Sequence, residues 1–183
     1  MEIPLIGVIG TSMKEDERRV PIHPEHLDRI PSNILEKLIF EKGYGLPFNI
    51  SDEELSQRTG GVSSRTSLLS DIGIVIITKP VVSDLKTLKK GGVLWGYTHC
   101  VQQEEMTQVA IDRKLTLIAF EDMFVWKPNG EMGRHTFYKN NEMAGYSAVI
   151  HALQLKGIDG HYGKQRKVII FSFGAVSRGA IYA

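Results

Sequence analysis

Short apolar runs alternate with helical patterns along most of the chain. The runs are rich in β-branched residues and bounded by Gly, Pro or Asp, as is typical of buried strands. We predict strands at Leu5–Ile9, Leu38–Glu41, Ile72–Thr78, Val93–Tyr97 and Leu115–Phe120. Helices are predicted between them at Pro24–Ile30, Asp52–Gln57 and Gln102–Lys114. This alternation predicts an α/β fold with an open, mostly parallel sheet and flanking helices.

A long helix follows this alternating region. The segment from Lys127 to Gly133 has strong turn chemistry and predicts a surface loop or hairpin before the helix. Residues 142–156 carry apolar side chains on nearly every side, so we expect a helix that is buried between two bodies and connects two domains. Glycines in the next stretch place a domain boundary near 157–166.

The last segment, 167–183, predicts an apolar strand, a glycine turn and a helix of small residues. Such a unit opens a dinucleotide-binding domain, where the cofactor's pyrophosphate lies against the helix start. The three-glycine fingerprint would place glycine at 172, 174 and 177, and only Gly174 matches. The alternative is an ordinary strand–turn–helix without a ligand. The candidate cofactor-binding residues are Ser172, Gly174, Ala175 and Val176.

Charge and cysteine content narrow the classes of partner. There are 22 Lys and Arg against 21 Asp and Glu, scattered along the chain, so we expect small-molecule ligands and neither nucleic acid nor membrane. Cys100 is the single cysteine, which excludes an internal disulfide and a cysteine zinc cluster; we interpret it as a small buried hydrophobe. No apolar stretch approaches the roughly 20 residues of a membrane helix, and the N-terminus lacks a basic signal-peptide start. We therefore expect a soluble, cytoplasmic protein.

Three candidate chemical groups follow predicted strands. Arg19 lies in a charged loop after the first strand, where a guanidinium can grip a carboxylate; pairing with local acids is the alternative. Lys79 follows another strand, although a solvent-exposed lysine is the simpler interpretation of that residue alone. His99 ends an apolar strand at the edge where chemistry occurs, and either proton transfer or a structural role fits it.

Two other histidines have a metal-like spacing. His23 and His26 are separated as metal ligands often are, but no further ligands accompany them. We interpret both as helix-start residues and predict no metal site.

Several motifs, in this order, carry a family resemblance. They are Glu17-Arg-Arg-Val-Pro, Glu41-Lys-Gly-Tyr-Gly, Gly96-Tyr-Thr-His, Phe137-Tyr-Lys-Asn and Ala144-Gly-Tyr. The chain resembles the N-terminal half of the alanine dehydrogenase and transhydrogenase superfamily, with most likeness to the N5-(carboxyethyl)ornithine synthases. The resemblance implies a Rossmann-like substrate domain at 1–141, a connector at 142–166, and at 167–183 the first strand–turn–helix of an NAD(P)-binding domain of which the rest is missing.

The resemblance also implies residue roles. Arg19 aligns with the arginine that binds the substrate carboxylate, and His99 aligns with the catalytic histidine. The family lysine stands two residues before a proline, where this chain has Thr78; Lys79 is adjacent and is our candidate for catalysis and substrate binding. Glu121 aligns with a carboxylate that can orient His99 or a substrate amine.

The implied activity is an NADH- or NADPH-dependent reductive condensation. A 2-oxo acid such as pyruvate would join the amino group of an ornithine- or lysine-like amino acid. Alanine dehydrogenase and saccharopine dehydrogenase activities are alternatives within the same chemistry. A non-catalytic nucleotide-binding, regulatory or transhydrogenase-like subunit is the alternative of another class, and this fragment alone is expected to be inactive. The resemblance further implies a homo-oligomer.

Overall fold

The computed structural model describes residues 3–158 and 162–183. It divides the chain into two compact units, Met1–Glu121 and Asp122–Ala183. The hairpin after Glu121 and the start of the following helix belong to the second unit. The substrate domain at 1–141 stays a prediction. Each unit is described below by itself.

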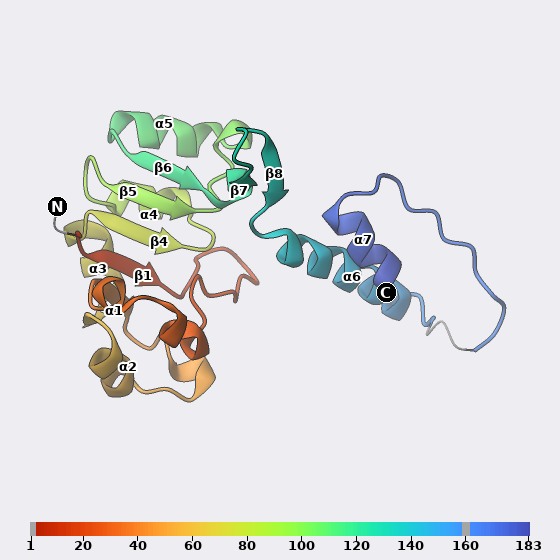
Figure 1. Ribbon diagram of the computed structural model, residues 1–183, viewed down its shortest axis with the longest axis horizontal. Helices are drawn as coiled ribbons and strands as arrows, with labels where there is room; N and C mark the ends of the chain where they lie inside the picture. Colours follow the sequence, from red (N-terminus) through yellow and green to blue (C-terminus); the bar gives the residue numbers. More distant parts are fainter. Residues whose placement is uncertain (1–2, 159–161) are drawn as a thin grey trace. The chain divides into compact units, whose positions relative to one another are not determined.

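The first unit contains a six-stranded parallel sheet (Figure 1). Its strand order is β3-β2-β1-β4-β5-β6, and β1 pairs with β2 on one side and with β4 on the other. The bounds are β1 Ile6–Ile9, β2 Leu38–Glu41, β3 Gly61–Ser63, β4 Ile74–Ile77, β5 Val93–Gly96 and β6 Thr116–Ala119. The five predicted strands are confirmed within two residues at each end, and β3 was not predicted. This is the Rossmann-like strand order.

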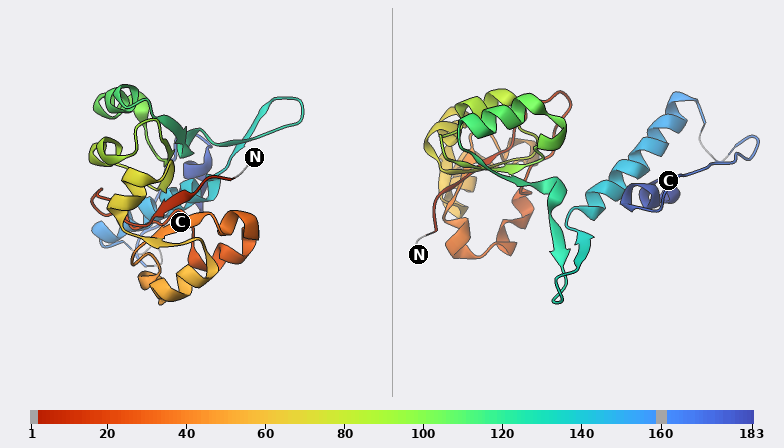
Figure 2. Two further views of the ribbon diagram at one scale, coloured as in Figure 1. Left: turned by 90° about the vertical axis from the view of Figure 1, so that its left-hand side faces the viewer. Right: turned by 90° about the horizontal axis from the view of Figure 1, so that it is seen from above.

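Helices lie against both faces of this sheet (Figures 1 and 2). One face is covered by α3 (Arg65–Asp71), α4 (Val82–Thr87) and α5 (Glu104–Asp112). The β1–β3 part of the other face is covered by the 3-10 helix η1 (Pro24–Arg29), by α1 (Ser32–Leu35) and by α2 (Asp52–Arg58). The predicted helices correspond to η1, α2 and α5, whereas α1, α3 and α4 were not predicted. Short 3-10 turns occur at η2 (Leu46–Phe48), η3 (Cys100–Gln102) and η4 (Phe120–Asp122).

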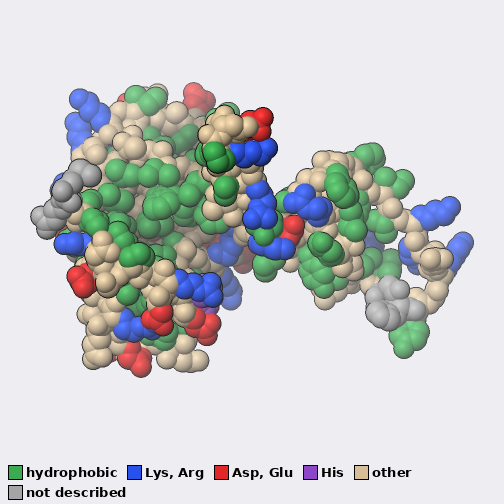
Figure 3. Space-filling view, viewed as in Figure 1, with side chains coloured by type: hydrophobic (Ala, Val, Ile, Leu, Met, Phe, Trp, Pro, Cys, Tyr) green, Lys and Arg blue, Asp and Glu red, His purple; other side chains and the backbone are tan. Residues whose placement is uncertain are grey.

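Each face of the sheet has its own core. In β1 the neighbours Val8 and Ile9 point to opposite faces and join different clusters of buried side chains. Val8 packs with Leu27 and Leu55 of the helices η1 and α2, while Ile9 packs with side chains of α3, α4 and α5. In Figure 3 apolar side chains remain visible over β4–β6, where no helix covers the sheet in this view.

The second unit is a hairpin followed by two helices. Strands β7 (Phe124–Trp126) and β8 (Met132–His135) pair antiparallel, which confirms the predicted turn segment between them. Helix α6 (Tyr138–Leu155) packs against α7 (Ala175–Tyr182). Gly145 and Gly179 allow this close crossing, because a Cβ on either would overlap a carbonyl oxygen of the other helix. The buried residues of these two helices are accordingly small.

Within the second unit α7 covers one side of α6, a helix on which Met143 and Leu155 are 69% and 73% exposed. The prediction that this helix connects two domains and is buried between them stays a prediction. The strand predicted in the last segment is wrong. Residues 167–173 form no strand, and Phe171 is 87% exposed. A strand needs a hydrogen-bonded neighbour, and the described strands of this unit, β7 and β8, pair only with each other.

Candidate functional site

The carboxyl ends of the strands bring the candidate residues of the first unit together. The strand order reverses at β1 and β4, so the loops that follow these two strands diverge to opposite faces. Such a point is where open α/β sheets bind their ligands. Arg19 lies on the loop after β1, and Lys79 lies on the loop after β4. His99 follows β5, which lies next to β4 in the sheet.

The guanidinium of Arg19 binds an internal carboxylate. Its Nε donates to Oε1 of Glu17 at 2.8 Å, and a terminal nitrogen lies 2.5 Å from Oε2. The hydrogen bonds from Arg19 hold the pKa of Glu17 below its ordinary value, and the positive charge of Lys79 acts in the same direction. Arg19, Lys79 and Glu17 therefore form one electrostatic cluster. This is the pairing with a local acid that the sequence offered as the alternative, and the binding of a substrate carboxylate by Arg19 stays a prediction.

Tyr97 links this cluster to His99. The Arg19 guanidinium carbon lies 5.4 Å from the centre of the Tyr97 ring, and the His99 ring stacks on Tyr97 at 6.0 Å between centres. Partial burial raises the pKa of Tyr97, so its hydroxyl remains protonated at neutral pH. The motif Gly96-Tyr-Thr-His thus carries two residues of the site, of which the sequence analysis had selected only His99.

Glu121 lies beside His99. Its Oε1 accepts a hydrogen bond from the His99 backbone N–H at 2.5 Å and is 3.7 Å from His99 Nδ1. The backbone of His99 is in the left-handed region, with φ of 47°. The side chains of His99 and Glu121 are 34% and 23% exposed, so both are accessible to a ligand. This arrangement can fix the imidazole and compensate its positive charge after protonation.

The two residues before Pro80 differ in their surroundings. Thr78 is buried, and its hydroxyl donates to the Arg19 carbonyl oxygen at 3.0 Å, so it supports the loop after β1. Lys79 is half-buried, and its carbonyl oxygen accepts a hydrogen bond from the Ser12 hydroxyl at 2.7 Å. Of these two neighbours, Lys79 supplies the cation near Glu17.

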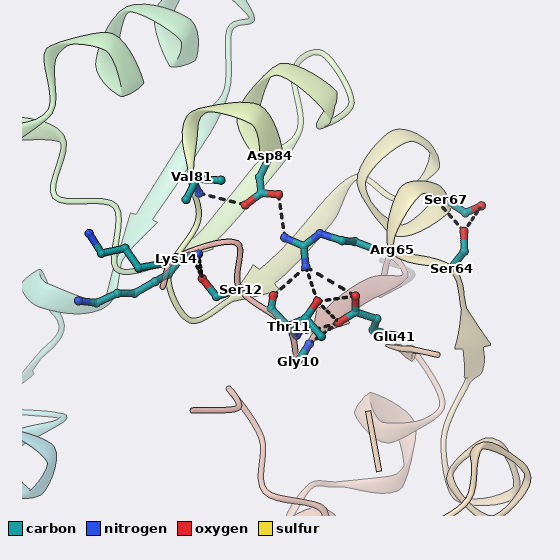
Figure 4. Close-up of polar contacts among 11 residues, drawn as sticks. Gly10, Thr11, Ser12, Lys14, Glu41, Ser64, Arg65, Ser67, Val81 and Asp84 are labelled. Carbon is teal, nitrogen blue, oxygen red and sulfur yellow. Dashed lines mark hydrogen bonds and ion pairs between the residues drawn. The ribbon is translucent and has the colours of Figure 1, made fainter. Parts of the chain in front are cut away.

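A polar network at the same edge was not recognised from the sequence (Figure 4). Oε2 of Glu41, the last residue of β2, accepts hydrogen bonds from the backbone N–H groups of Gly10 and Thr11 at 2.9 and 2.8 Å. The Arg65 guanidinium binds the Thr11 carbonyl oxygen and Asp84, each at 2.7 Å. The sequence signal for this network was Glu41, an acidic residue that ends an otherwise apolar strand. In the structure Glu41 is 6% exposed.

A cavity of about 380 Å³ lies beside the loop after β1. The ring residues Tyr44 and Phe48 line it together with the charged residues Glu17 and Arg18. The Tyr44 hydroxyl donates to the Ile22 carbonyl oxygen at 2.6 Å, which anchors the far end of the same loop. The lining of the cavity therefore combines aromatic rings with one acidic and one basic residue, and the cavity shares Glu17 with the Arg19 cluster.

The candidate cofactor residues lie at the start of α7 in the second unit. Gly174 caps the helix, whose first hydrogen bond runs from Arg178 N–H to the Gly174 carbonyl oxygen at 3.0 Å. The N–H groups of Ala175 and Val176 precede that bond. A Cβ on Gly174 would meet nothing within 4 Å, so the space beside this backbone is open. Ser172 has φ of 74°. These residues fit the close approach of a phosphate group to a helix N-terminus.

Other sequence predictions concern single side chains. His23 caps η1, since its Nδ1 accepts from the Glu25 N–H at 3.3 Å, and its interpretation as a helix-start residue is confirmed. Cys100 is half-buried and packs against the core. Within residues 3–158 and 162–183, no group of three or more His, Cys, Asp or Glu is placed to hold a metal ion. None of the described helices is long and apolar enough to cross a membrane.

Comparisons with known proteins agree with this architecture. Residues 8–131 match the family model described as alanine dehydrogenase/PNT, N-terminal domain. An alanine dehydrogenase of Methanococcus maripaludis is 31% identical over 121 residues, which are 64% of this chain and 31% of that protein. The N(5)-(carboxyethyl)ornithine synthase of Lactococcus lactis subsp. lactis is 27% identical over 184 residues, covering 96% of this chain and 56% of that protein.

Solved structures show the same fold. An L-alanine dehydrogenase matches with a TM-score of 0.67 and 23% identity, over 97% of this chain and 50% of that one. A transhydrogenase from Sinorhizobium meliloti matches with a TM-score of 0.63 and 19% identity, over 82% of this chain and 44% of that one. The chain thus spans about half or less of the length of these relatives.

Proposed function

The chain belongs to the alanine dehydrogenase/PNT N-terminal domain family, and on this premise we propose that it is the substrate-binding part of an NAD(P)H-dependent oxidoreductase. The reaction proposed is the reductive condensation of a 2-oxo acid with the amino group of an amino acid. The observation that supports it most is the contact series Arg19–Tyr97–His99, in which a guanidinium and an imidazole lie against the same aromatic ring.

Arg19 would bind the carboxylate of the oxo acid. Glu17 already occupies the guanidinium with two parallel hydrogen bonds, the geometry that a substrate carboxylate would adopt. In the proposed complex the substrate carboxylate exchanges with Glu17, and Lys79 adds a second positive charge. Arg19 and Lys79 lie on different loops, so together they would fix the orientation of a small acid.

His99 would transfer the protons. The amine adds to the keto carbon of the oxo acid to give a carbinolamine, whose hydroxyl must leave as water to form an imine. A protonated imidazole can supply the proton for that step, and Glu121, 3.7 Å from Nδ1, would stabilise its charge. Lys79 is the other candidate for proton transfer at the keto oxygen.

The start of α7 would hold the cofactor. Ser172, Gly174, Ala175 and Val176 would bind its pyrophosphate through backbone N–H groups. When bound, reduced nicotinamide supplies the hydride that converts the imine to the amine product. In this proposal residues 1–141 form the substrate domain, 142–166 the connector, and 167–183 the first part of the nucleotide-binding domain.

The cavity favours an amino acid over ammonia as the amine. A zwitterion has one carboxylate and one ammonium, and the lining of the cavity offers Arg18 to the first and Glu17, once displaced from Arg19, to the second. Ammonia would not need this space. Alanine dehydrogenase activity remains the second candidate, because the relative that is 31% identical bears that name. Saccharopine dehydrogenase-like activity would use the same residues with a longer oxo acid.

The test is NADH and NADPH oxidation by the complete gene product. Pyruvate or 2-oxoglutarate is offered with ornithine, lysine or ammonia. We expect amine-dependent oxidation with pyruvate plus ornithine or lysine. If pyruvate supports oxidation only with ammonia, the activity is that of an alanine dehydrogenase. If 2-oxoglutarate plus lysine supports oxidation, the activity is of the saccharopine dehydrogenase type.

Two variants test the residue roles. His99→Asn is expected to lower kcat by about 10²–10⁴-fold, while Arg19→Ala is expected to raise KM for the oxo acid. Asparagine is chosen at 99 because it tolerates the left-handed backbone. No oxidation with any pair of substrates would reject the proposed chemistry and favour a non-catalytic nucleotide-binding subunit.

A further inference from the structure

We propose that Arg65 is a positioning residue that sets the spacing between the two substrate-binding loops, those after β1 and β4. This inference rests on the proposed function, since it is the roles of Arg19 and Lys79 that give the spacing its meaning. The contacts themselves are independent of that function. Arg65 follows β3, at the far edge of the sheet from His99, and binds Thr11 on the first loop and Asp84 just after the second.

The place of Arg65 in its helix indicates a non-local role. It is the first residue of α3, directly after the capping residue Ser64. A positive charge in the first turn is unfavourable beside the positive end of the helix dipole. Acidic residues occupy the first turn of α2, as the dipole favours. The cost at Arg65 is offset by its contacts with Thr11 after β1, Glu41 of β2 and Asp84 of α4.

On the β1 side Arg65 holds Thr11. One guanidinium nitrogen donates to the Thr11 carbonyl oxygen at 2.7 Å and to its hydroxyl at 2.8 Å (Figure 4). The Thr11 hydroxyl in turn donates to Glu41 at 2.7 Å, and its backbone N–H donates to the same carboxylate. Every polar group of Thr11 is thereby fixed, at the start of the loop that carries Arg19.

On the β4 side Arg65 holds Asp84. Its other terminal nitrogen donates to Oδ1 of Asp84 at 2.7 Å, and Oδ2 accepts the Val81 N–H at 3.0 Å. Asp84 therefore fixes the chain two residues after Lys79. A second link connects the same two loops, because the Ser12 hydroxyl donates to the Lys79 carbonyl oxygen. The guanidinium is planar and rigid, so it fixes the distance between Thr11 on one loop and Asp84 after the other.

Because this network is buried, each of its charged groups depends on its partners. The side chains of Glu41, Asp84 and Arg65 are 7%, 4% and 20% exposed. Two carboxylates share one guanidinium, and the remaining negative charge is stabilised by the N–H groups of Gly10, Thr11 and Val81. Such buried charges need all their partners. A lysine at position 65 would keep the charge, but it cannot bind Thr11 and Asp84 in the same fixed geometry.

Amide hydrogen exchange tests the structural part. In Arg65→Lys we expect the Thr11 and Val81 amides to exchange at least about tenfold faster, because each lies beside a lost charge-assisted hydrogen bond. Amides of β5 should keep their protection. The matched control is Arg58→Lys, which alters an exposed ion pair with Asp28 and should leave all these amides unchanged. Unchanged protection at both Thr11 and Val81 in Arg65→Lys would overturn the inference.

Thr11 tests the link to substrate binding. Thr11→Val removes the hydroxyl that joins Arg65 to Glu41, whereas Thr11→Ser keeps it. We expect Thr11→Val to raise KM for the oxo acid about tenfold with less than a twofold change in kcat, and Thr11→Ser to restore KM. A fall in kcat alone, or equal KM in the two variants, would contradict a positioning role.

The two proposals can fail separately. If wild-type protein neither binds nor turns over any oxo acid, the proposed function fails. The exchange experiment then still decides whether Arg65 holds the two loops. If wild-type protein turns over an oxo acid while Thr11 and Val81 stay protected in Arg65→Lys, the proposed function stands and the positioning role is rejected.

Discussion

Arg65 and Arg19 follow two strands of the same sheet, and both bind a glutamate, but their surroundings differ. Arg65 lies among buried partners, two carboxylates and the backbone of Thr11, and its side chain is 20% exposed. Arg19 is 43% exposed and pairs with Glu17, two residues away in the chain. The first arginine is held by Thr11 after β1, by Glu41 at the end of β2 and by Asp84 in α4, while the second pairs with the neighbouring Glu17. One edge of the sheet therefore carries a buried arginine network beside a more exposed arginine pair, and the exposed pair is the one that our proposed function uses.

The largest expected difference is in stability. Arg65→Ala would leave the buried carboxylates of Glu41 and Asp84 without their cation, and we expect a loss of about 3–5 kcal/mol in the free energy of unfolding. Arg58→Ala, which removes an exposed pair, should cost no more than about 1 kcal/mol. Urea denaturation followed by circular dichroism measures both. Equal losses in the two variants would remove the distinction between buried and exposed arginines.

Arg19→Ala should show the opposite pattern. If Arg19 binds the substrate carboxylate, its removal loses charge-assisted hydrogen bonds of about 1.5–3 kcal/mol, or about 10- to 150-fold in affinity. The free energy of unfolding should change by less than about 1 kcal/mol. Pyruvate titration followed by NMR, with Arg18→Ala as the adjacent control, measures the affinity. Weaker binding in Arg18→Ala than in Arg19→Ala would exchange the roles of the two arginines.

Gly10→Ala tests the close packing of the Tyr44 ring against the chain that follows β1. A Cβ at residue 10 would lie 2.6 Å from a ring carbon of Tyr44, so the ring would have to move away from the Ile22 backbone that it binds. We expect a loss of about 1–3 kcal/mol. The control is Gly73→Ala, because a Cβ at residue 73 would meet no neighbour within 4 Å. Gly130→Ala would not serve, since the φ of 81° at Gly130 strains any side chain. A Gly10→Ala protein as stable as Gly73→Ala would show that this ring yields without cost.

The smallest predicted effect is on pH dependence. The pKa of Glu17 is lower in the folded protein than its ordinary value of 4.5. The stabilisation from its pair with Arg19 is therefore complete above that value and is lost as the pH falls through the lower, folded-state pKa. Glu17→Gln should flatten the decline of the melting temperature over this acidic range, and it should bind pyruvate more tightly at neutral pH. A decline as steep as that of wild type would contradict the assignment.

The predictable and unpredictable parts of the fold differ in their physical origin. The strands β1, β2 and β4–β6 are apolar runs with buried neighbours, so local pattern was sufficient to find them. Strand β3, Gly61-Val62-Ser63, has no such run and exists through its pairing with β2. Residues 167–173 show the converse case, an apolar run without a partner strand among the described residues.

The site divides in the same way. His99, Lys79 and Arg19 each follow a predicted strand, so their common edge could be foreseen from the rule for parallel sheets. The role of Arg65 could not be foreseen, because its partners Thr11 and Asp84 are 54 and 19 residues away in sequence and neither lies in a recognisable motif. Tyr97 was within a quoted motif, but only the geometry shows its ring between Arg19 and His99.

The left-handed backbone at His99 has a consequence for sequence variation. Gly adopts positive φ most readily, Asn, Asp and His follow, and β-branched residues do so least. In a saturation library at this position, selection for folding alone should therefore enrich Asn, Asp and Gly, whereas selection for turnover should retain histidine. Among natural sequences of this architecture, proteins that have lost the activity should accordingly have asparagine or glycine at position 99. Valine or isoleucine should seldom occur there.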